Sequence, residues 1–384
     1  MKIALTGVET NNKGAELMLY SILQEIENRF PQVEVYVPID SIKQGLNYIQ
    51  SKVILHNKPY STLIKLCRKF FITGALYRLK LPCLFLTDVH AVKGVDYFLD
   101  ASGFIFSDLW NPSDAICYKW KHQLEGYRRQ GSKIIFLPQA FGPLEKPNTK
   151  KLIDSIATNA DLIFAREEVS YNYLINYGVP AGKLKIYPDF TASVGGIFPE
   201  RYNHLKGAVC IIPNCRMVDK GNTINYDDYL KFLTKTIDLC VRKGKNVYLL
   251  NHEGSSDEEF ALKCAAQINH NIEVVTGLNG LEIKGLISMA YLCITSRFHG
   301  AVSALNTCVP CLATSWSHKY KELFKTYGFE DNILPLNDFR NSALMIEDYL
   351  QPEKNNQVRE NLLDVVNHIK KQNADMWDMI WKIK

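Results

Sequence analysis

The stretch YLCITSRFHGAVSALNTCVPCLATSWSHKY, residues Tyr291–Tyr320, decides the fold that we expect for this chain. Its first residues, Tyr291–Thr295, form an apolar run typical of a buried strand, and residues 300–305 continue as the first turns of a helix. A second apolar run, Val309–Ala313, ends in a polar cluster. The pattern therefore predicts a strand, a loop, a helix and a second strand, which is the repeating unit of a parallel α/β sheet.

Titratable side chains follow both strands of this unit. Arg297 and His299 come after the first strand together with Ser296, and His318 and Lys319 come after the second. Ligands of open α/β sheets bind at the carboxyl ends of the strands, and a cation beside a helix N-terminus is suited to an anion. A simpler interpretation is that Arg297 and His299 only cap a helix and pair with surface acids, as Arg and His commonly do.

The same alternation of strand and helix runs through most of the chain, which predicts an α/β fold with parallel sheets covered on both faces. In the first half we expect strands at 2–7, 33–38 and 96–106, and over 133–143 a buried strand that runs into a loop containing Gln139. Helices are expected at 14–30 and 114–130, and an α/β unit over 148–178. In the second half we expect strands at about 207–213, 246–251, 272–276, 291–296 and 310–315, and helices at 226–243, 257–269, 280–290 and 299–307.

The length of 384 residues makes two domains the default. We predict an N-terminal Rossmann-like domain over residues 1–194 and a C-terminal one over 207–345, joined by the polar, Gly- and Pro-containing stretch 195–206. Residues 346–384 are expected to form a helical segment, and the amphipathic helix at 356–384 is expected to pack back on the first domain.

Composition excludes several classes of protein. The net charge of +5 is spread thinly and gives no nucleic-acid footprint. We see neither a signal peptide at the N-terminus nor a run of about 18 apolar residues, so we expect a cytoplasmic protein. The ten cysteines are interpreted as reduced, buried side chains, and Cys308 and Cys311 lack a second matched pair for zinc. No carboxylate or histidine spacing typical of a metal site appears, and we expect no metal and no bound cofactor.

Further candidate contacts lie at the ends of other strands. Asn12 and Gly14 belong to a first β-to-α turn that can bind phosphate or sugar through backbone N–H groups, although a plain turn explains these residues equally well. Gln139, Arg166 and His252 each follow a predicted strand. We list them as possible substrate contacts.

Residues 61–88 interleave basic with apolar side chains. Such a segment can lie on an anionic membrane surface, but it is more often a core helix with a basic solvated face. A peripheral contact with the inner face of the membrane is one prediction from this segment.

Several phrases, read together and in order over roughly residues 1–325, resemble the polysaccharide pyruvyl transferase family. They are NNKGAELML, LPQAFGP, FAREEVSYNYL, YPDFTASV, NHEGSSDEEF and SRFHGAVSALNTCVPCLATSWSHKY. Two departures from the family pattern are Ala15 and the triplet Ala101-Ser102-Gly103, and both concern the acceptor side.

The resemblance implies a fold like that of the two-domain GT-B glycosyltransferases, in which two Rossmann-like halves face a cleft. It implies transfer of pyruvate from phosphoenolpyruvate to two hydroxyls of a sugar in a cell-surface polysaccharide or its lipid-linked precursor, which forms a cyclic ketal and releases phosphate. The first domain would then be the acceptor side and the second the donor side. The oligomeric state and the identity of the sugar are left open.

The implied chemistry assigns a role to each of the principal candidates. A donor with a carboxylate and a phosphate needs fixed cations, and protonation of the enol carbon needs a general acid. His299 is the expected acid/base, Arg297 and Lys319 are expected to hold the phosphate, and Arg166 is a candidate clamp for the carboxylate. His252 and His318 are candidates for acceptor contacts.

Two rival functions remain open at this level. The first is a GT-B-type glycosyltransferase that uses a nucleotide sugar, and the second is a non-catalytic sugar-binding protein of a polysaccharide assembly complex. The first would need an acidic ribose anchor beside the donor motif. The second predicts that the wild type and a His299→Ala variant are equally inert with every acceptor.

Overall fold

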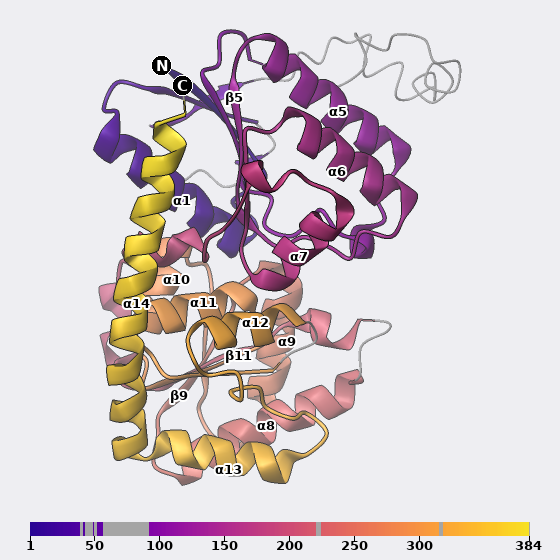
Figure 1. The fold of residues 1–384 in the computed structure, drawn as a ribbon. Coiled ribbons are helices and arrows are strands. Elements are labelled where there is room, and N and C mark those ends of the chain that lie inside the picture. The colour runs from indigo at the N-terminus through magenta and orange to yellow at the C-terminus, as the bar shows by residue number, and fades with distance from the viewer. Residues whose placement is uncertain are drawn as a thin grey trace, which may run out of the picture. The chain divides into compact units, whose positions relative to one another are not determined.

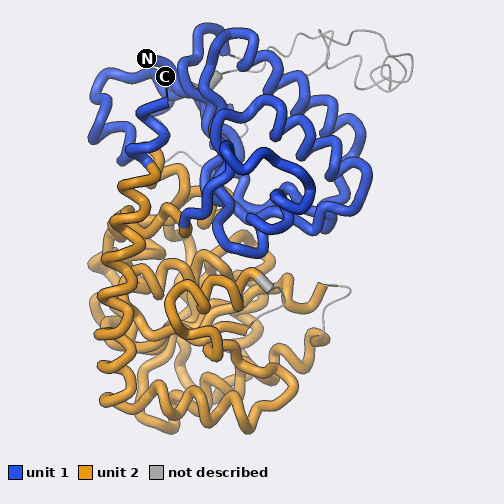
Figure 2. Tube along the Cα trace, viewed as in Figure 1, with its two compact units in different colours: residues 1–10, 23–187, 377–384 blue, residues 11–22, 188–376 orange. Residues whose placement is uncertain are grey.

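The computed structural model describes residues 1–38, 41–42, 49, 52–56, 92–219, 224–314 and 318–383. The chain divides into two compact units (Figure 2). Unit 1 comprises residues 1–10, 23–187 and 377–384, and unit 2 comprises residues 11–22 and 188–376. This division differs from the predicted boundaries, because the segment 11–22 and the expected linker 195–206 both lie in unit 2.

Unit 1 is built on a parallel sheet whose strands are β1 (Lys2–Thr6), β2 (Glu34–Pro38), β3 (Ile54–His56), β4 (Tyr97–Asp100), β5 (Lys133–Gln139), β6 (Leu162–Ala165) and β7 (Leu184–Ile186). Their order is β3-β2-β1-β4-β5-β6-β7. The main helices are α5 (Asp114–Arg129), α6 (Pro147–Asn159) and α7 (Glu168–Tyr177) (Figure 1). Because every residue of β6 is buried, side chains cover both faces of the sheet there.

Small residues mark the end of one predicted strand. The sequence predicts a strand within 96–106 that ends in the small residues 101–103, and β4 ends just before them at Asp100. Gly103 adopts φ of +72°, and the Phe104 N–H donates to the Ser102 carbonyl at 2.8 Å, so the chain turns directly after the strand. The small residues that follow β4 therefore form a tight loop at the carboxyl end of the sheet.

The end of the last helix packs within unit 1, which confirms the prediction that the C-terminal helix returns to the first domain. The helix α14 (Pro352–Trp381) belongs to unit 1 from residue 377 onward. The Trp381 ring meets the rings of Phe30 and Tyr97 edge-on, with 5.1 Å between centroids in each case. Its indole N–H donates to Glu25 Oε1 at 3.2 Å.

Unit 2 repeats the architecture with the strands β8 (Val209–Ile212), β9 (Val247–Leu250), β10 (Glu273–Val275), β11 (Leu292–Thr295) and β12 (Cys311–Ala313). They are all parallel and ordered β10-β9-β8-β11-β12. The helices are α8 (Tyr226–Arg242), α9 (Gly254–Ala266), α10 (Gly280–Ser288), α11 (Phe298–Asn306), α12 (His318–Thr326), α13 (Phe339–Leu350) and most of α14 (Figure 1). The first helix of the chain, α1 (Lys13–Arg29), contributes residues 13–22.

The strand order of unit 2 places a topological switch between β8 and β11. From β8 the chain proceeds outward through β9 and β10 on one side, and β11 and β12 add on the other. All four residues of β8 and of β11 are buried, so only the loops at their ends can reach a ligand. Ligands of doubly wound sheets bind outside the carboxyl ends of the strands at such a switch. The residues that follow β11 are Ser296, Arg297 and the start of α11, as the sequence predicted.

Two expectations concern the membrane. No helix in the described part of the chain combines the length and the apolar character that a bilayer crossing requires. The basic and apolar segment 61–88 lies outside the described residues, so its predicted contact with a membrane surface stays a prediction.

Candidate functional site

Backbone hydrogen bonding and close packing fix the start of α11. The Thr295 hydroxyl accepts from the Arg297 N–H at 3.0 Å and donates to the Arg297 carbonyl at 3.1 Å. Gly300 lies in the first turn, where a Cβ would fall within 3.0 Å of Thr295 Oγ1 and Ile212 Cδ1. Glycine therefore lets the helix approach the ends of β8 and β11 closely, and this approach sets the positions of Arg297 and His299.

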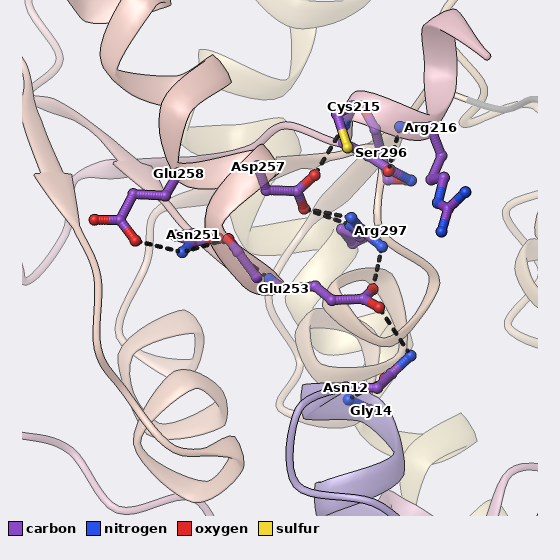
Figure 3. A network of polar contacts seen from close by, with 12 residues as sticks. Asn12, Gly14, Cys215, Arg216, Asn251, Glu253, Asp257, Glu258, Ser296 and Arg297 are labelled. Atoms are coloured by element: carbon purple, nitrogen blue, oxygen red, sulfur yellow. Dashed lines mark hydrogen bonds and ion pairs between the residues drawn. The ribbon is translucent and has the colours of Figure 1, made fainter. Parts of the chain in front are cut away.

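The guanidinium of Arg297 is held by two carboxylates from the start of α9 (Figure 3). Nε donates to Asp257 Oδ2 at 2.7 Å, and Nη1 pairs with Glu253. Asp257 is fully buried and also accepts from the Cys215 N–H at 2.9 Å, whereas the Glu253 side chain is one-third exposed. Arg297 therefore pairs with acids, as the simpler interpretation expects. These acids are not surface residues, however, because Asp257 is buried and Glu253 is only partly exposed.

The first β-to-α turn joins this network, since the predicted residues Asn12 and Gly14 both belong to unit 2. The Asn12 amide donates to Glu253 Oε1 at 3.3 Å, and its Oδ1 accepts from the N–H groups of Gly14 and Ala15 at 3.0 and 3.2 Å (Figure 3). Asn12 thus caps α1 and steadies Glu253 at once. Asn12 therefore serves both as the cap of a helix and as a partner of the charged network around Arg297.

His299 is the second residue of α11 and has neighbours on two sides. Its Nε2 lies 3.8 Å from Asp189 Oδ2, and its side chain is 16% exposed. A Cβ on Gly14 would fall within 3.0 Å of the Nδ1, Cγ and Cε1 atoms of the ring. The imidazole is therefore confined between a carboxylate and a glycine backbone, an arrangement that can hold and transfer a proton.

His252 lies beside these groups but is buried in the protein. Burial, and then the charges of Arg297, His299 and Lys13, lower its pKa well below the usual value. A histidine in that environment stays neutral near pH 7. The structure thus gives His252 the character of a neutral partner of the network.

The remaining candidates of the decisive stretch have different surroundings. The Nζ atom of Lys319 lies 5.2 Å from the centroid of the Phe298 ring, and Phe298 directly precedes His299 in the sequence. The main chain of His318 begins α12, and its side chain is not among those described. Ser296 is buried, and its hydroxyl bonds the Tyr229 hydroxyl at 2.5 Å and Thr314. The Ser296 hydroxyl thus makes its hydrogen bonds to buried side chains, whereas a substrate contact would face the site.

Gln139 and Arg166 belong to unit 1, at the carboxyl ends of β5 and β6. The Gln139 amide donates to Asp100 Oδ1 at 2.8 Å, and both side chains are buried. Burial raises the pKa of Asp100 to about 6. Arg166 is also buried, with Nε 3.9 Å from Glu167 Oε2. The structure does not test the predicted substrate contacts of these two residues.

Two charged groups, Asp189 beside His299 and Lys284 on the Asp189 side of the site, were not singled out from the sequence. Asp189 lies in the quoted phrase YPDFTASV, where its position before a turn makes it look like an ordinary cap, and it does cap the short 3-10 helix η4 (Phe190–Ser193). Lys284 of α10 is buried and donates to the Thr191 carbonyl at 2.7 Å. Burial lowers its pKa to about 7, and the charge of Asp189 opposes that shift. Within the described ranges, no cluster of three or more His, Cys, Asp or Glu side chains has the form of a metal site.

Comparisons with known proteins give one family and a set of folds. A family model described as polysaccharide pyruvyl transferase matches residues 12–318. The amylovoran biosynthesis protein AmsJ of Erwinia amylovora is 21% identical over 373 residues, which cover 86% of this chain and 87% of that protein.

Solved structures of similar fold include a UDP-GlcNAc 2-epimerase from Neisseria meningitidis bound to UDP-GlcNAc, with a TM-score of 0.60, 10% identity and full coverage of both chains. A second is Anabaena Alr3699/HepE in complex with UDP and glucose, with a TM-score of 0.60, 10% identity and coverage of 100% and 99%. At these identities the likeness concerns the fold alone, and it confirms the predicted GT-B-like class of two Rossmann-like domains.

Proposed function

This chain belongs to the polysaccharide pyruvyl transferase family, and from that premise we propose that it transfers the pyruvyl group of phosphoenolpyruvate to two hydroxyls of a sugar, forming a cyclic ketal and releasing phosphate. The observation that supports this proposal most directly is the position of His299. It lies at the switch point of the unit 2 sheet, at the start of a helix and beside a carboxylate. A proton donor at that place meets the first demand of the reaction, which is protonation of the enol carbon.

The cations around His299 suit an anionic donor. Arg297 is the N-cap residue of α11, two positions before His299, and Lys319 lies over the Phe298 ring. We propose that Lys319 contacts the phosphate and that Arg297 supplies positive charge while its guanidinium stays anchored by Asp257. Direct contact between Arg297 and the phosphate would require Glu253, which is one-third exposed, to release Nη1 of the guanidinium.

The acceptor is proposed from the family and from its named relative. AmsJ carries the name of an amylovoran biosynthesis protein, and the family description names polysaccharides. We therefore propose a sugar of an extracellular polysaccharide, or a lipid-linked precursor of it, as the acceptor. Gln139, Arg166 and His318 remain proposed contacts of the substrates.

The test uses the full-length protein with phosphoenolpyruvate and a panel of short glycans. We expect phosphate release that depends on the glycan, and a product heavier than the acceptor by one pyruvylidene group in mass spectrometry. His299→Asn should abolish both signals with unchanged circular dichroism. The matched control is His204→Asn, because His204 is exposed and pairs with Glu273 at 2.7 Å away from the site.

Two outcomes would favour the rival functions. Transfer from a nucleotide sugar, with no response to phosphoenolpyruvate, would identify a glycosyltransferase. Glycan binding that is identical in the wild type and in His299→Asn, with no phosphate release from any acceptor, would identify a non-catalytic sugar-binding protein.

A further inference from the structure

The two ring nitrogens of His299 have different environments. Nε2 is buried and lies 3.8 Å from Asp189 Oδ2, which is an ion-pair distance. Nδ1 is the ring nitrogen that lies against Gly14. The side chain keeps 16% of its surface exposed while Nε2 is buried, so the exposed part of the ring excludes the atom that faces Asp189.

The carboxylate of Asp189 is fixed by its own neighbours. Oδ1 accepts from the Thr191 N–H at 3.0 Å and from the Thr191 hydroxyl at 2.6 Å. The Thr191 carbonyl in turn accepts from Lys284 at 2.7 Å, and the Asp189 carbonyl accepts from the Asn373 amide at 3.2 Å. With Oδ1 engaged twice, Oδ2 is the oxygen directed at His299.

The charges favour one protonation pattern. If Nε2 carried a lone pair, two acceptors would face each other in a buried place, which is unfavourable without a donor between them. A proton on Nε2 instead directs an N–H at the carboxylate and leaves Nδ1 as the nitrogen that gains and loses its proton.

We propose that Asp189 is a positioning residue that keeps the proton on Nε2 of His299, so that Nδ1 is the atom that exchanges a proton with the substrate. This inference rests on the proposed function. In the step that it implies, the Nδ1–H of the imidazolium protonates C3 of the enol, with the C2–C3 π pair forming the new C–H bond. The sugar hydroxyl oxygen bonds to the electron-deficient C2, and the hydroxyl proton returns to Nδ1. The C2–O bond to phosphate then breaks with its electron pair on the phosphate oxygen. The second hydroxyl oxygen bonds to C2 to close the ketal, and the proton of that hydroxyl passes to the departing phosphate.

Gly14 has a part in the same arrangement. Any side chain at this position would place its Cβ within 3.0 Å of Nδ1 and two neighbouring ring atoms. Glycine therefore provides the clearance that keeps Nδ1 in place. The sequence had suggested backbone contact with a ligand for this residue, and the structure adds contact with the catalytic imidazole.

The first experiment is independent of catalysis. Full-length protein labelled with ¹⁵N-histidine has nine histidines, and His299→Asn identifies the signals of His299 in a long-range ¹H–¹⁵N correlation spectrum. We expect neutral His299 to carry its proton on Nε2 in the wild type. In Asp189→Asn, which keeps the Oδ1 acceptor for Thr191, we expect the pKa of His299 to fall by at least about one unit.

The surroundings of the ring must be considered in reading that titration. Besides Asp189, the charged or titratable groups near His299 come from α11 itself, the β9-to-α9 loop, α1 and α12, and they are Arg297, His252, Lys13 and Lys319. The matched control is Asp238→Asn, because Asp238 pairs with Arg242 at 3.0 Å on an exposed face of α8. This control should leave the His299 signals in place.

The outcomes separate the inference from the proposed function. A neutral His299 with its proton on Nδ1, or a His299 pKa that is unchanged in Asp189→Asn, would overturn the inference even in an active enzyme. The expected tautomer in a protein that fails to consume phosphoenolpyruvate would support the positioning role of Asp189 and overturn the proposed reaction.

Gly14→Ala gives a second test that does not depend on Asp189. We expect kcat of pyruvyl transfer to fall by about 100-fold, because a displaced proton donor loses its alignment with C3. The chemical shifts of His299 should move in the same variant. Unchanged kcat and unchanged His299 shifts in a folded Gly14→Ala protein would contradict the assignment of Nδ1.

Discussion

Replacement of Arg297 by methionine should destabilise unit 2 as well as remove activity. The side chain is 12% exposed and holds two carboxylates, one of which, Asp257, is fully buried. Methionine keeps much of the volume and removes the charge. Asp257 would then lie in the interior with the Cys215 N–H as its remaining partner among the contacts described above.

The size of the effect follows from which carboxylate loses its partner. Removing one member of a buried ion pair typically costs about 3–5 kcal/mol of unfolding free energy, and the retained Cys215 bond places the expected value near about 3 kcal/mol. Glu253→Gln breaks the other half of the pairing, but Glu253 is one-third exposed and water can replace the lost charge. We expect that change to cost less than about 1 kcal/mol.

The assay is urea unfolding followed by far-ultraviolet circular dichroism, with phosphate release measured on the same samples. Arg242→Met is the matched control, since Arg242 is exposed and pairs with Asp238 at the surface. It should change the unfolding free energy by no more than about 0.5 kcal/mol. If Arg297→Met were as stable as this control and merely failed to bind phosphoenolpyruvate, Arg297 would be a ligand contact with no structural part, and the reasoning from its ion pairs would be refuted.

Three further outcomes are expected. Lys284→Met should be more stable than the wild type, most strongly below pH 7, and this difference should shrink as the pH rises toward 10.5. The reason is that the pKa of Lys284 is about 7 in the folded state and about 10.5 in the unfolded state, so the wild type gains stability between these two values. Parallel pH profiles of the two proteins in urea titrations would contradict this. Asp100→Asn should match the wild type near pH 4 and exceed it increasingly as the pH rises through about 6, since the buried carboxyl holds its proton more tightly when folded; thermal melts at four pH values test it. Ser296→Ala should cost about 1–2 kcal/mol of unfolding free energy through the lost bond to Tyr229 while leaving KM for phosphoenolpyruvate unchanged, and a raised KM would show a substrate contact instead.

Local patterns in the sequence were sufficient for the elements around the site. The apolar run Tyr291–Thr295 and the small residues after His299 predicted a strand and a helix, and the structure has β11 at Leu292–Thr295 and α11 at Phe298–Asn306. Hydrophobic periodicity reports burial along neighbouring residues, and both elements are buried. The position of the candidate site at the sheet edge followed from the α/β class alone.

The partners of the site residues could not be read from the same patterns. Asp189 precedes His299 by more than a hundred positions, and its carboxylate looks like that of any turn residue until the fold brings the two together. Ser296 illustrates the opposite case. It is a polar residue at a strand end, and the interior bonds of its side chain separate it from an exposed contact. Long-range contacts and side-chain direction decide both questions, and neither has a signature in local sequence.

The assignment of residues 11–22 to the second unit bears on how the chain reaches its folded state during synthesis. The contact between Asn12 and Glu253 joins positions 241 apart, so a segment that leaves the ribosome early must wait for partners made much later. Contacts of such separation form slowly, and the waiting strands and helices are exposed to misassembly meanwhile. A gene fragment that begins at Pro188 would lack the turn that steadies Glu253 and clears space for His299, so the second unit cannot be obtained whole by cutting the gene at that point.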